Sequence, residues 1–73
     1  MIPNYTYRVF WYEPDECYFA IVLDVPELEL MSAFGDTPTE ALQELMIALG
    51  GVAESYHEEG REMPEPQVVV KAV

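Results

Sequence analysis

Hydrophobic and polar residues alternate along the first part of the chain with the two-residue period that is typical of β-strands. Residues 5–12 are dense in aromatic and β-branched types and predict a first strand. Its two faces are Tyr7, Val9 and Trp11 on one side and Thr6, Arg8, Phe10 and Tyr12 on the other. Residues 13–16 include Pro14 and Asp15, which favour a tight turn, so residues 17–23 are expected to return as the second strand of a hairpin.

The second predicted strand is apolar on both faces. These faces are Cys17, Phe19, Ile21 and Leu23 against Tyr18, Ala20 and Val22. A strand of this kind is normally covered on both sides. A helix can cover one side, and in a chain of this size only a partner is left for the other.

A third strand is predicted over residues 28–34, after a break at residues 24–27. Pro26 causes the break because it cannot donate a ladder hydrogen bond. The charge of Glu29 favours an edge position, where it would discourage unwanted strand pairing.

The spacing of apolar residues then changes to a helical period, which predicts one long helix from residue 38 to about residue 59. Thr37 and Glu40 have the spacing of a capping box, in which the Thr oxygen accepts the amide proton of Glu40 and the Glu carboxylate reaches back to the amide of Thr37. Pro38 suits the first helical position, and Asp36 adds negative charge near the positive end of the helix dipole. Asp36, Thr37 and Glu40 are therefore predicted to be structural capping residues, and Gly60 is predicted to end the helix.

One face of the predicted helix forms an apolar stripe broad enough to cover a small sheet. The stripe consists of Ala41, Leu42, Leu45, Met46, Ala48, Leu49, Val52, Ala53 and Tyr56. Ile47 points away from it, and Gly50 and Gly51 lie in the middle of the helix, where each costs about 1 kcal/mol relative to Ala. Two interpretations remain open: a local weak point or kink, or an oligomer contact at Ile47, Gly50 and Gly51.

After a linker at residues 61–66 that contains two prolines, the valine-rich residues 67–73 predict a last strand. A strand that follows a helical crossover lies parallel to its neighbour. The expected fold is therefore a single α+β domain over residues 1–73 with the order βββαβ: a three-stranded antiparallel meander, a parallel fourth strand and one helix on one sheet face.

Composition narrows the possible partners. Fourteen acidic and three basic residues give a net charge of −11, which repels nucleic-acid backbones and anionic lipids and attracts basic proteins. The chain has 73 residues, of which 51% are hydrophobic, and this is more apolar surface than one small core can bury. We therefore expect a homo-oligomer. The start of the chain lacks a signal-peptide pattern and no apolar run is long enough to span a membrane, which predicts a cytoplasmic protein.

Few residues offer catalytic or metal chemistry. Cys17 is the only cysteine, which excludes an internal disulfide and a Cys-based zinc site, and we expect it to be a small hydrophobe within a strand. Glu54, His57 and Glu58 have the i, i+3 and i+4 spacing that could supply half of a metal site, although a solvated polar face gives the same pattern. No phosphate loop, nucleophile elbow or catalytic triad is visible, so no catalytic, cofactor or metal site is predicted and the chain is expected not to be an enzyme.

Several motifs together resemble the HicB-like antitoxin family over nearly the whole chain. They are Tyr18-x-Ala20, Val25-Pro26-Glu27-Leu28, Gly35-Asp36-Thr37-x-x-Glu40-Ala41-Leu42 and Met63-Pro64-Glu65-Pro66. The Gly-Asp-Thr-x-x-Glu-Ala block, at its distance from the Pro-Glu-Leu segment, is the most specific of them. The resemblance implies a partial ribonuclease H fold without the catalytic carboxylates.

The resemblance also implies a role in neutralising a small basic mRNA-cleaving toxin, HicA. Carboxylates on the predicted hairpin and near the helix end would then be the contacts: Glu13, Asp15, Glu16, Glu54, Glu58 and Glu59. The chain departs from the family in having Glu29-Leu30 where Pro-Gly is common, and it stops without the DNA-binding domain of full antitoxins, so direct operator binding is not implied. Two alternatives are an orphan oligomeric domain with a regulatory or ligand-binding role and a small metal-dependent hydrolase that uses Glu54, His57 and Glu58.

Overall fold

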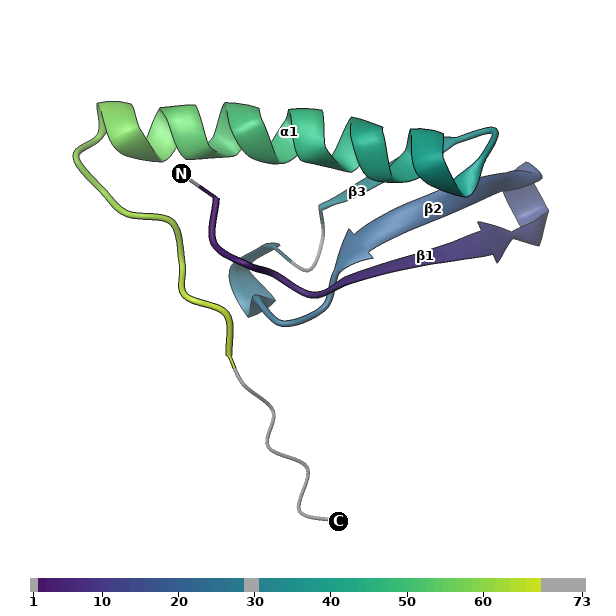
Figure 1. Ribbon diagram of the computed structural model, residues 1–73, viewed down its shortest axis with the longest axis horizontal. Helices are drawn as coiled ribbons and strands as arrows, with labels where there is room; N and C mark the ends of the chain where they lie inside the picture. The colour runs from purple at the N-terminus through teal and green to yellow at the C-terminus, as the bar shows by residue number, and fades with distance from the viewer. Residues whose placement is uncertain (1, 29–30, 68–73) are drawn as a thin grey trace, which may run out of the picture.

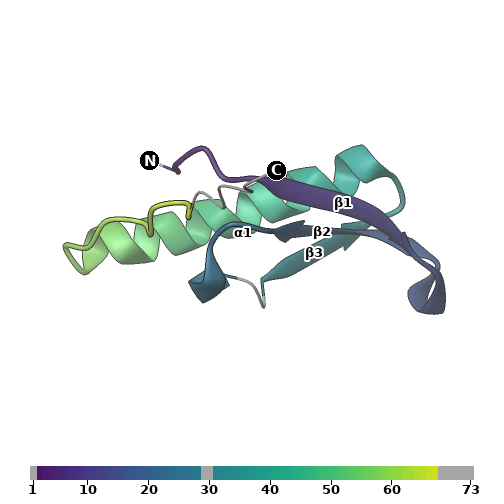
Figure 2. The same ribbon diagram turned by 90° about the horizontal axis from the view of Figure 1, so that it is seen from below.

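The computed structural model describes residues 2–28 and 31–67, in which three antiparallel strands form a sheet and one long helix packs across one of its faces (Figure 1). The strands are β1 (Tyr7–Tyr12), β2 (Cys17–Val22) and β3 (Ser32–Gly35), in the sheet order β1-β2-β3, and the helix is α1 (Pro38–Glu58). The predicted α+β class is therefore confirmed for these residues. Figure 2 shows the molecule from the side of the strands, with α1 behind them.

β1 and β2 form the predicted hairpin, with slightly shorter strands than predicted. β1 begins at Tyr7 and not at Tyr5, and β2 ends at Val22, one residue before the predicted end. Phe10 lies opposite Phe19, and Tyr12 lies opposite Cys17. The connection is a short 3-10 turn, η1 (Glu13–Asp15), which closes when the N–H of Glu16 donates to the carbonyl oxygen of Glu13 over 3.1 Å. Glu16 adopts a left-handed conformation with φ of 49°, which reverses the chain into β2.

The third strand is shorter than predicted. Residues 28–34 were expected to form it, but Leu28 ends a 3-10 turn, η2 (Pro26–Leu28), and β3 begins at Ser32. Pro26 provides the fixed φ that starts such a turn, and the N–H of Leu28 donates to the carbonyl oxygen of Val25 over 2.9 Å. Leu28 is buried in the core as the last residue of this turn, and not as the first residue of a strand. β3 lies at one edge of this sheet, as expected.

The N-terminus of α1 is capped largely as the sequence predicts. Thr37 is the N-cap, and its hydroxyl accepts a hydrogen bond from the N–H of Glu40 over 3.1 Å. The Glu40 carboxylate accepts from the N–H of Asp36 over 3.0 Å, rather than from that of Thr37 as predicted. The capping box therefore also anchors the residue that follows β3.

The C-terminus of α1 ends in a Schellman motif. The N–H of Gly60 donates to the carbonyl oxygen of His57 over 3.0 Å, and the N–H of Arg61 donates to the carbonyl oxygen of Tyr56 over 2.8 Å. Gly60 has the positive φ, 71°, that this motif requires. Glycine therefore ends the helix where predicted, with Glu59 as the C-cap.

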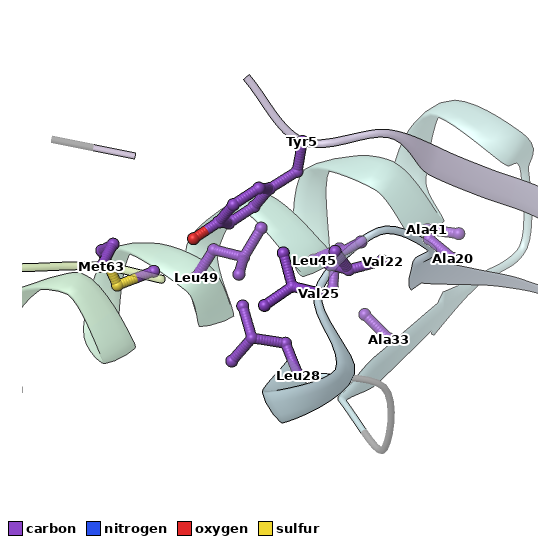
Figure 3. Packing of buried hydrophobic residues seen from close by; sticks show 10 residues of the cluster. All are labelled: Tyr5, Ala20, Val22, Val25, Leu28, Ala33, Ala41, Leu45, Leu49 and Met63. Carbon is purple, nitrogen blue, oxygen red and sulfur yellow. The ribbon is translucent and has the colours of Figure 1, made fainter. Parts of the chain in front are cut away.

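The core lies between the sheet and α1 and continues past the strands to the segments near both chain ends (Figure 3). Its buried residues are Tyr5, Ala20, Val22, Val25, Leu28, Ala33, Ala41, Leu45, Leu49 and Met63. The predicted helical stripe is confirmed, since Ala41, Leu45 and Leu49 are fully buried and the rest of the stripe is at least partly buried.

Residues 61–67 run back from the helix end toward the start of β1 without regular secondary structure. The Tyr5 hydroxyl donates to the carbonyl oxygen of Pro64 over 2.6 Å, and the N–H of Gln67 donates to the carbonyl oxygen of Asp24 over 2.8 Å. The predicted fourth strand spans residues 67–73, of which 68–73 lie outside the described residues. Nowhere in 2–28 or 31–67 is there a helix with the length and apolarity needed to cross a membrane.

Candidate functional site

The predicted partner-contact carboxylates form two separate groups. Glu13, Asp15 and Glu16 are exposed at the turn of the hairpin, and the second group is exposed near the C-terminus of α1. This second group consists of Glu54, Glu58 and Glu59. Figure 1 shows that the hairpin turn and the C-terminus of α1 lie at opposite ends of the molecule. The structure therefore does not bring the six carboxylates together on one surface.

At the hairpin end, carboxylates lie beside exposed aromatic rings. The indole N–H of Trp11 donates to the Glu13 carboxylate over 2.5 Å, and the Trp11 ring meets the ring of Tyr18 edge-on with 5.2 Å between centroids. Trp11 is 48% exposed and Tyr12 is 39% exposed. Carboxylates accept hydrogen bonds from guanidinium or ammonium groups, and ring faces attract the same cations, so this end is chemically suited to Arg or Lys side chains.

The helix end has a different character because it contains a cation of its own. Arg61 stacks over the Tyr56 ring at 4.6 Å and pairs with the Glu59 carboxylate at 3.4 Å. An open cavity of about 420 Å³ lies next to it. Its lining residues are Pro3, Ala53, His57, Arg61, Glu62, Met63 and Glu65. Arg61 offsets part of the negative charge here, which makes this end less suited to a basic partner than the hairpin end.

The half metal site considered from the sequence gains no further ligands. Glu54, His57 and Glu58 are all exposed on the last turns of α1. Within the described ranges, no three His, Cys, Asp or Glu side chains are grouped so that they could hold a metal ion.

The face of the sheet opposite α1 is mostly apolar, and the described strand residues on it include no carboxylate. We call it the outer sheet face. It consists of Arg8, Phe10, Tyr12, Cys17, Phe19, Ile21, Ser32 and Phe34. Alternation along the strands assigns it, because the neighbouring row of Val9, Ala20 and Ala33 faces the helix side. Among the described residues no element covers this face.

Aromatic contacts hold the middle of the outer sheet face together. The Phe19 ring lies 4.7 Å from that of Tyr12, 6.1 Å from that of Phe10 and 6.0 Å from that of Phe34, between centroids. The Arg8 guanidinium lies 4.8 Å above the ring of Phe10. Phe34 nevertheless remains 66% exposed.

Cys17, at one corner of this face, is a half-buried free thiol. Burial raises the pKa of the thiol, and the negative charges of Asp15 and Asp36 raise it further. The protonated thiol is a poor nucleophile, so these surroundings do not activate Cys17.

The predicted oligomer contacts on α1 are accessible. Ile47 is 69% exposed, and a Cβ added to Gly50 or Gly51 would meet no atom within 4 Å. The space beside the two glycines is open among the described residues, and their role in an oligomer stays a prediction.

Gly35 has a positional role that the sequence reasoning missed. A Cβ on this residue would lie 2.7 Å from the backbone nitrogen of Ala41 and 2.7 Å from the Cβ of Glu40. Only glycine lets the end of β3 pass this close to the first turn of α1. Its position directly before the capping box was the available signal.

Of these surfaces, the hairpin end has the chemistry that best fits a macromolecular partner of opposite charge, and the outer sheet face has the largest group of aromatic rings in contact with one another. No family model, curated protein or solved structure matches the chain.

Proposed function

We propose that the chain is a non-enzymatic, HicB-like protein-binding module that neutralises a small basic HicA-like, RNA-cleaving toxin. The observation that carries this proposal is a net charge of −11 combined with carboxylates beside exposed aromatic rings at the hairpin end. The motif resemblance, centred on the block from Gly35 to Leu42, supports it independently. Such an intracellular role also agrees with a cytoplasmic location.

Charge favours this class of partner over others. A strongly acidic surface attracts a basic protein at long range, accelerates the encounter, and repels RNA that would compete for the toxin. Within residues 2–28 and 31–67, the one carboxylate in an ion pair is that of Glu59, which pairs with Arg61. The hairpin carboxylates can therefore serve an external cation.

The hairpin end offers the contacts that dominate protein interfaces. An incoming arginine can pair with the carboxylate of Asp15 or Glu16 while its guanidinium plane lies on the ring of Trp11 or Tyr12. Aromatic and arginine side chains supply a large share of interface hot spots. Masking arginines and lysines of a nuclease would remove the groups that hold its RNA substrate.

The finer fold that accompanies this role is a degenerate ribonuclease H domain with residues 67–73 as a fourth strand parallel to β1. Two observations support it. The N–H of Gln67 donates to Asp24, whose carboxylate in turn accepts hydrogen bonds from the N–H of Thr6 just before β1. The residues that follow Gln67 include three consecutive valines, which are strong strand formers.

The test uses the protein encoded next to the gene for this chain, which is expected to be small and basic. The purified pair is expected to form a complex by calorimetry, and the chain is expected to stop RNA cleavage by its partner. The proposal would be overturned if the two proteins formed no complex, if the partner did not cleave RNA, or if the chain did not stop that cleavage.

Two matched variants locate the contact. One carries Glu13→Gln, Asp15→Asn and Glu16→Gln at the hairpin, and the other carries Glu54→Gln, Glu58→Gln and Glu59→Gln on the helix, so both remove three negative charges. We expect the hairpin variant to weaken binding on the order of 10- to 100-fold and the helix variant much less, because only close charge pairs have large coupling energies. Equal losses would show that net charge alone, and not the hairpin end, directs binding.

A further inference from the structure

We propose that two copies of this chain form a symmetric dimer by packing their outer sheet faces against each other. The proposal does not depend on the toxin-neutralising role, and its surface shares only the ring of Tyr12 with the contacts proposed at the hairpin end. It assigns the dimer contact to the sheet, not to Ile47, Gly50 and Gly51 on α1.

The first argument is the amount and continuity of apolar surface on this face. Phe19 occupies the centre, in ring contact with Tyr12, Phe10 and Phe34, and Ile21 continues the apolar surface along β2. Leu23, directly after β2, is 54% exposed. Phe34 is also largely exposed, whereas Phe10, Phe19 and Ile21 are half-buried. Neighbouring apolar side chains that remain in water often mark an interaction surface. Burial of a fully exposed large apolar side chain contributes about 1.5–3 kcal/mol, and the half-buried ones would contribute less.

The second argument is charge, which identifies the occupant as a second copy. Two chains with a net charge of −11 repel each other, so they can associate closely only through a surface that keeps carboxylates apart. None of the acidic residues that the structure describes belongs to the outer sheet face, which includes Arg8, one of only three basic residues in the sequence. A basic partner would find no countercharge on this face.

Nucleic acid is a poorer fit for the same reason. Exposed aromatic rings on a sheet can stack with unpaired bases, but such sites need a positively charged surface along the phosphates. The outer sheet face has one arginine, Arg8, and the chain has a net charge of −11, so it would repel the phosphates.

The third argument is geometry. A two-fold interface uses the same patch twice, so the patch must be complementary to itself. With the symmetry axis near Phe19, the cross-strand row of Phe10, Phe19 and Phe34 meets its own copy. Sheets that pack face to face lie about 10 Å apart with interdigitating side chains, a spacing that aromatic rows from both copies can fill.

The experiment measures self-association of the whole chain by light scattering and sedimentation equilibrium between 1 and about 200 μM, a range that brackets the affinity of typical modest dimers. Wild type is expected to be dimeric with a dissociation constant in the micromolar range or below. Phe34→Glu is expected to raise that constant by at least about 50-fold, because it places two carboxylates in the dimer contact. Ile47→Glu is the matched control, since Ile47 is 69% exposed, Phe34 is 66% exposed and the charge change is the same; we expect less than a threefold change.

Far-UV circular dichroism establishes that each variant remains folded. If Phe34→Glu does not fold, Phe34→Thr keeps a strand-forming residue and is expected to weaken the dimer in the same direction by a smaller factor. Added salt provides a second criterion: dimerisation of like-charged chains through an apolar face strengthens with salt, whereas binding of a basic partner weakens.

Three results would overturn the proposal. The first is a wild-type chain that is monomeric at 200 μM, which is also the result expected if the chain's own C-terminal residues covered this face. The second is a dimer that Ile47→Glu disrupts and the Phe34 variants do not. The third is a wild-type chain that binds single-stranded polyuridine through Phe34. Failure to find a toxin partner would leave the dimer proposal unaffected, so the two proposals fail separately.

Discussion

The hydroxyl of Tyr5 donates a 2.6 Å hydrogen bond to the carbonyl oxygen of Pro64, which joins two positions 59 residues apart. The Tyr5 ring is buried in the core at the same time, so one side chain fixes both the segment before β1 and the segment after α1. The two ends of the described chain are thus held together by a residue that precedes the first strand.

Removal of this hydroxyl tests its contribution. Tyr5→Phe keeps the buried ring and is expected to lower the free energy of unfolding by about 1 kcal/mol, because the Pro64 carbonyl loses its donor. Urea unfolding measures the change. Tyr12→Phe, which removes a hydroxyl from a more exposed ring, is the control and should change stability by less than about 0.5 kcal/mol. Equal effects of the two substitutions would contradict a specific role for the Tyr5 bond.

The same hydroxyl makes stability depend on pH in the alkaline range. Burial raises the pKa of Tyr5 above its ordinary value of 10.0, and burial also raises the pKa of Tyr7. A raised native pKa means that the folded state holds the proton more tightly, so the stabilisation is complete below pH 10 and is lost as the pH rises through the native pKa. Urea midpoints between pH 8 and about 11.5 should fall at the alkaline end, with a smaller fall in Tyr5→Phe. A midpoint that rose with pH in wild type would have the wrong sign.

The helix cap at Thr37 is expected to contribute measurably to the free energy of unfolding. Thr37→Ala removes the oxygen that accepts from the N–H of Glu40, and is expected to cost about 1 kcal/mol of stability. Thr39→Ala alters an exposed threonine two residues later, beyond the cap, and is expected to be nearly neutral. Thermal or urea unfolding of the two variants separates capping from a general loss of threonine.

Two glycines should respond to alanine in opposite directions. Gly35→Ala forces a Cβ to within 2.7 Å of the backbone nitrogen of Ala41, and the required shift of β3 against α1 is expected to cost about 1–3 kcal/mol. Gly51→Ala meets no atom and is expected to stabilise the chain by up to about 1 kcal/mol, because alanine favours the helical backbone. Destabilisation by Gly51→Ala in a chain kept monomeric by dilution would indicate that the helix needs flexibility at this point.

Local patterns predicted most of the fold because they act over a few residues. The alternation over residues 5–12 predicted the first strand, although β1 begins only at Tyr7. The capping box at Thr37 and the glycine at Gly60 each define a helix boundary through contacts with near neighbours. The strand predicted over residues 28–34 was wrong in its first part because Leu28 is drawn into the core by a turn, and burial against distant segments is not encoded in alternation.

The candidate site was less predictable for the same reason. Sequence spacing places Glu13 and Glu58 equally well on a partner surface, but their positions at opposite ends depend on how the hairpin lies under the helix. The close approach at Gly35 likewise exists only once β3 meets α1. The apolar outer sheet face was foreseeable from the two-sided apolar pattern of β2, whereas the ring contacts of Phe19 needed the register.

The two adjacent glycines of α1 divide the helix into parts with different support. Up to Leu49 the helix is anchored by fully buried side chains, and Figure 1 shows that its C-terminal part extends past the strands. Beyond Gly51 its apolar side chains, those of Val52, Ala53 and Tyr56, are only partly buried against the core. Amide hydrogen exchange should therefore reveal two cooperative units. We expect amide protons after Gly51 to exchange through local opening, and those around Leu45 to exchange only through global unfolding.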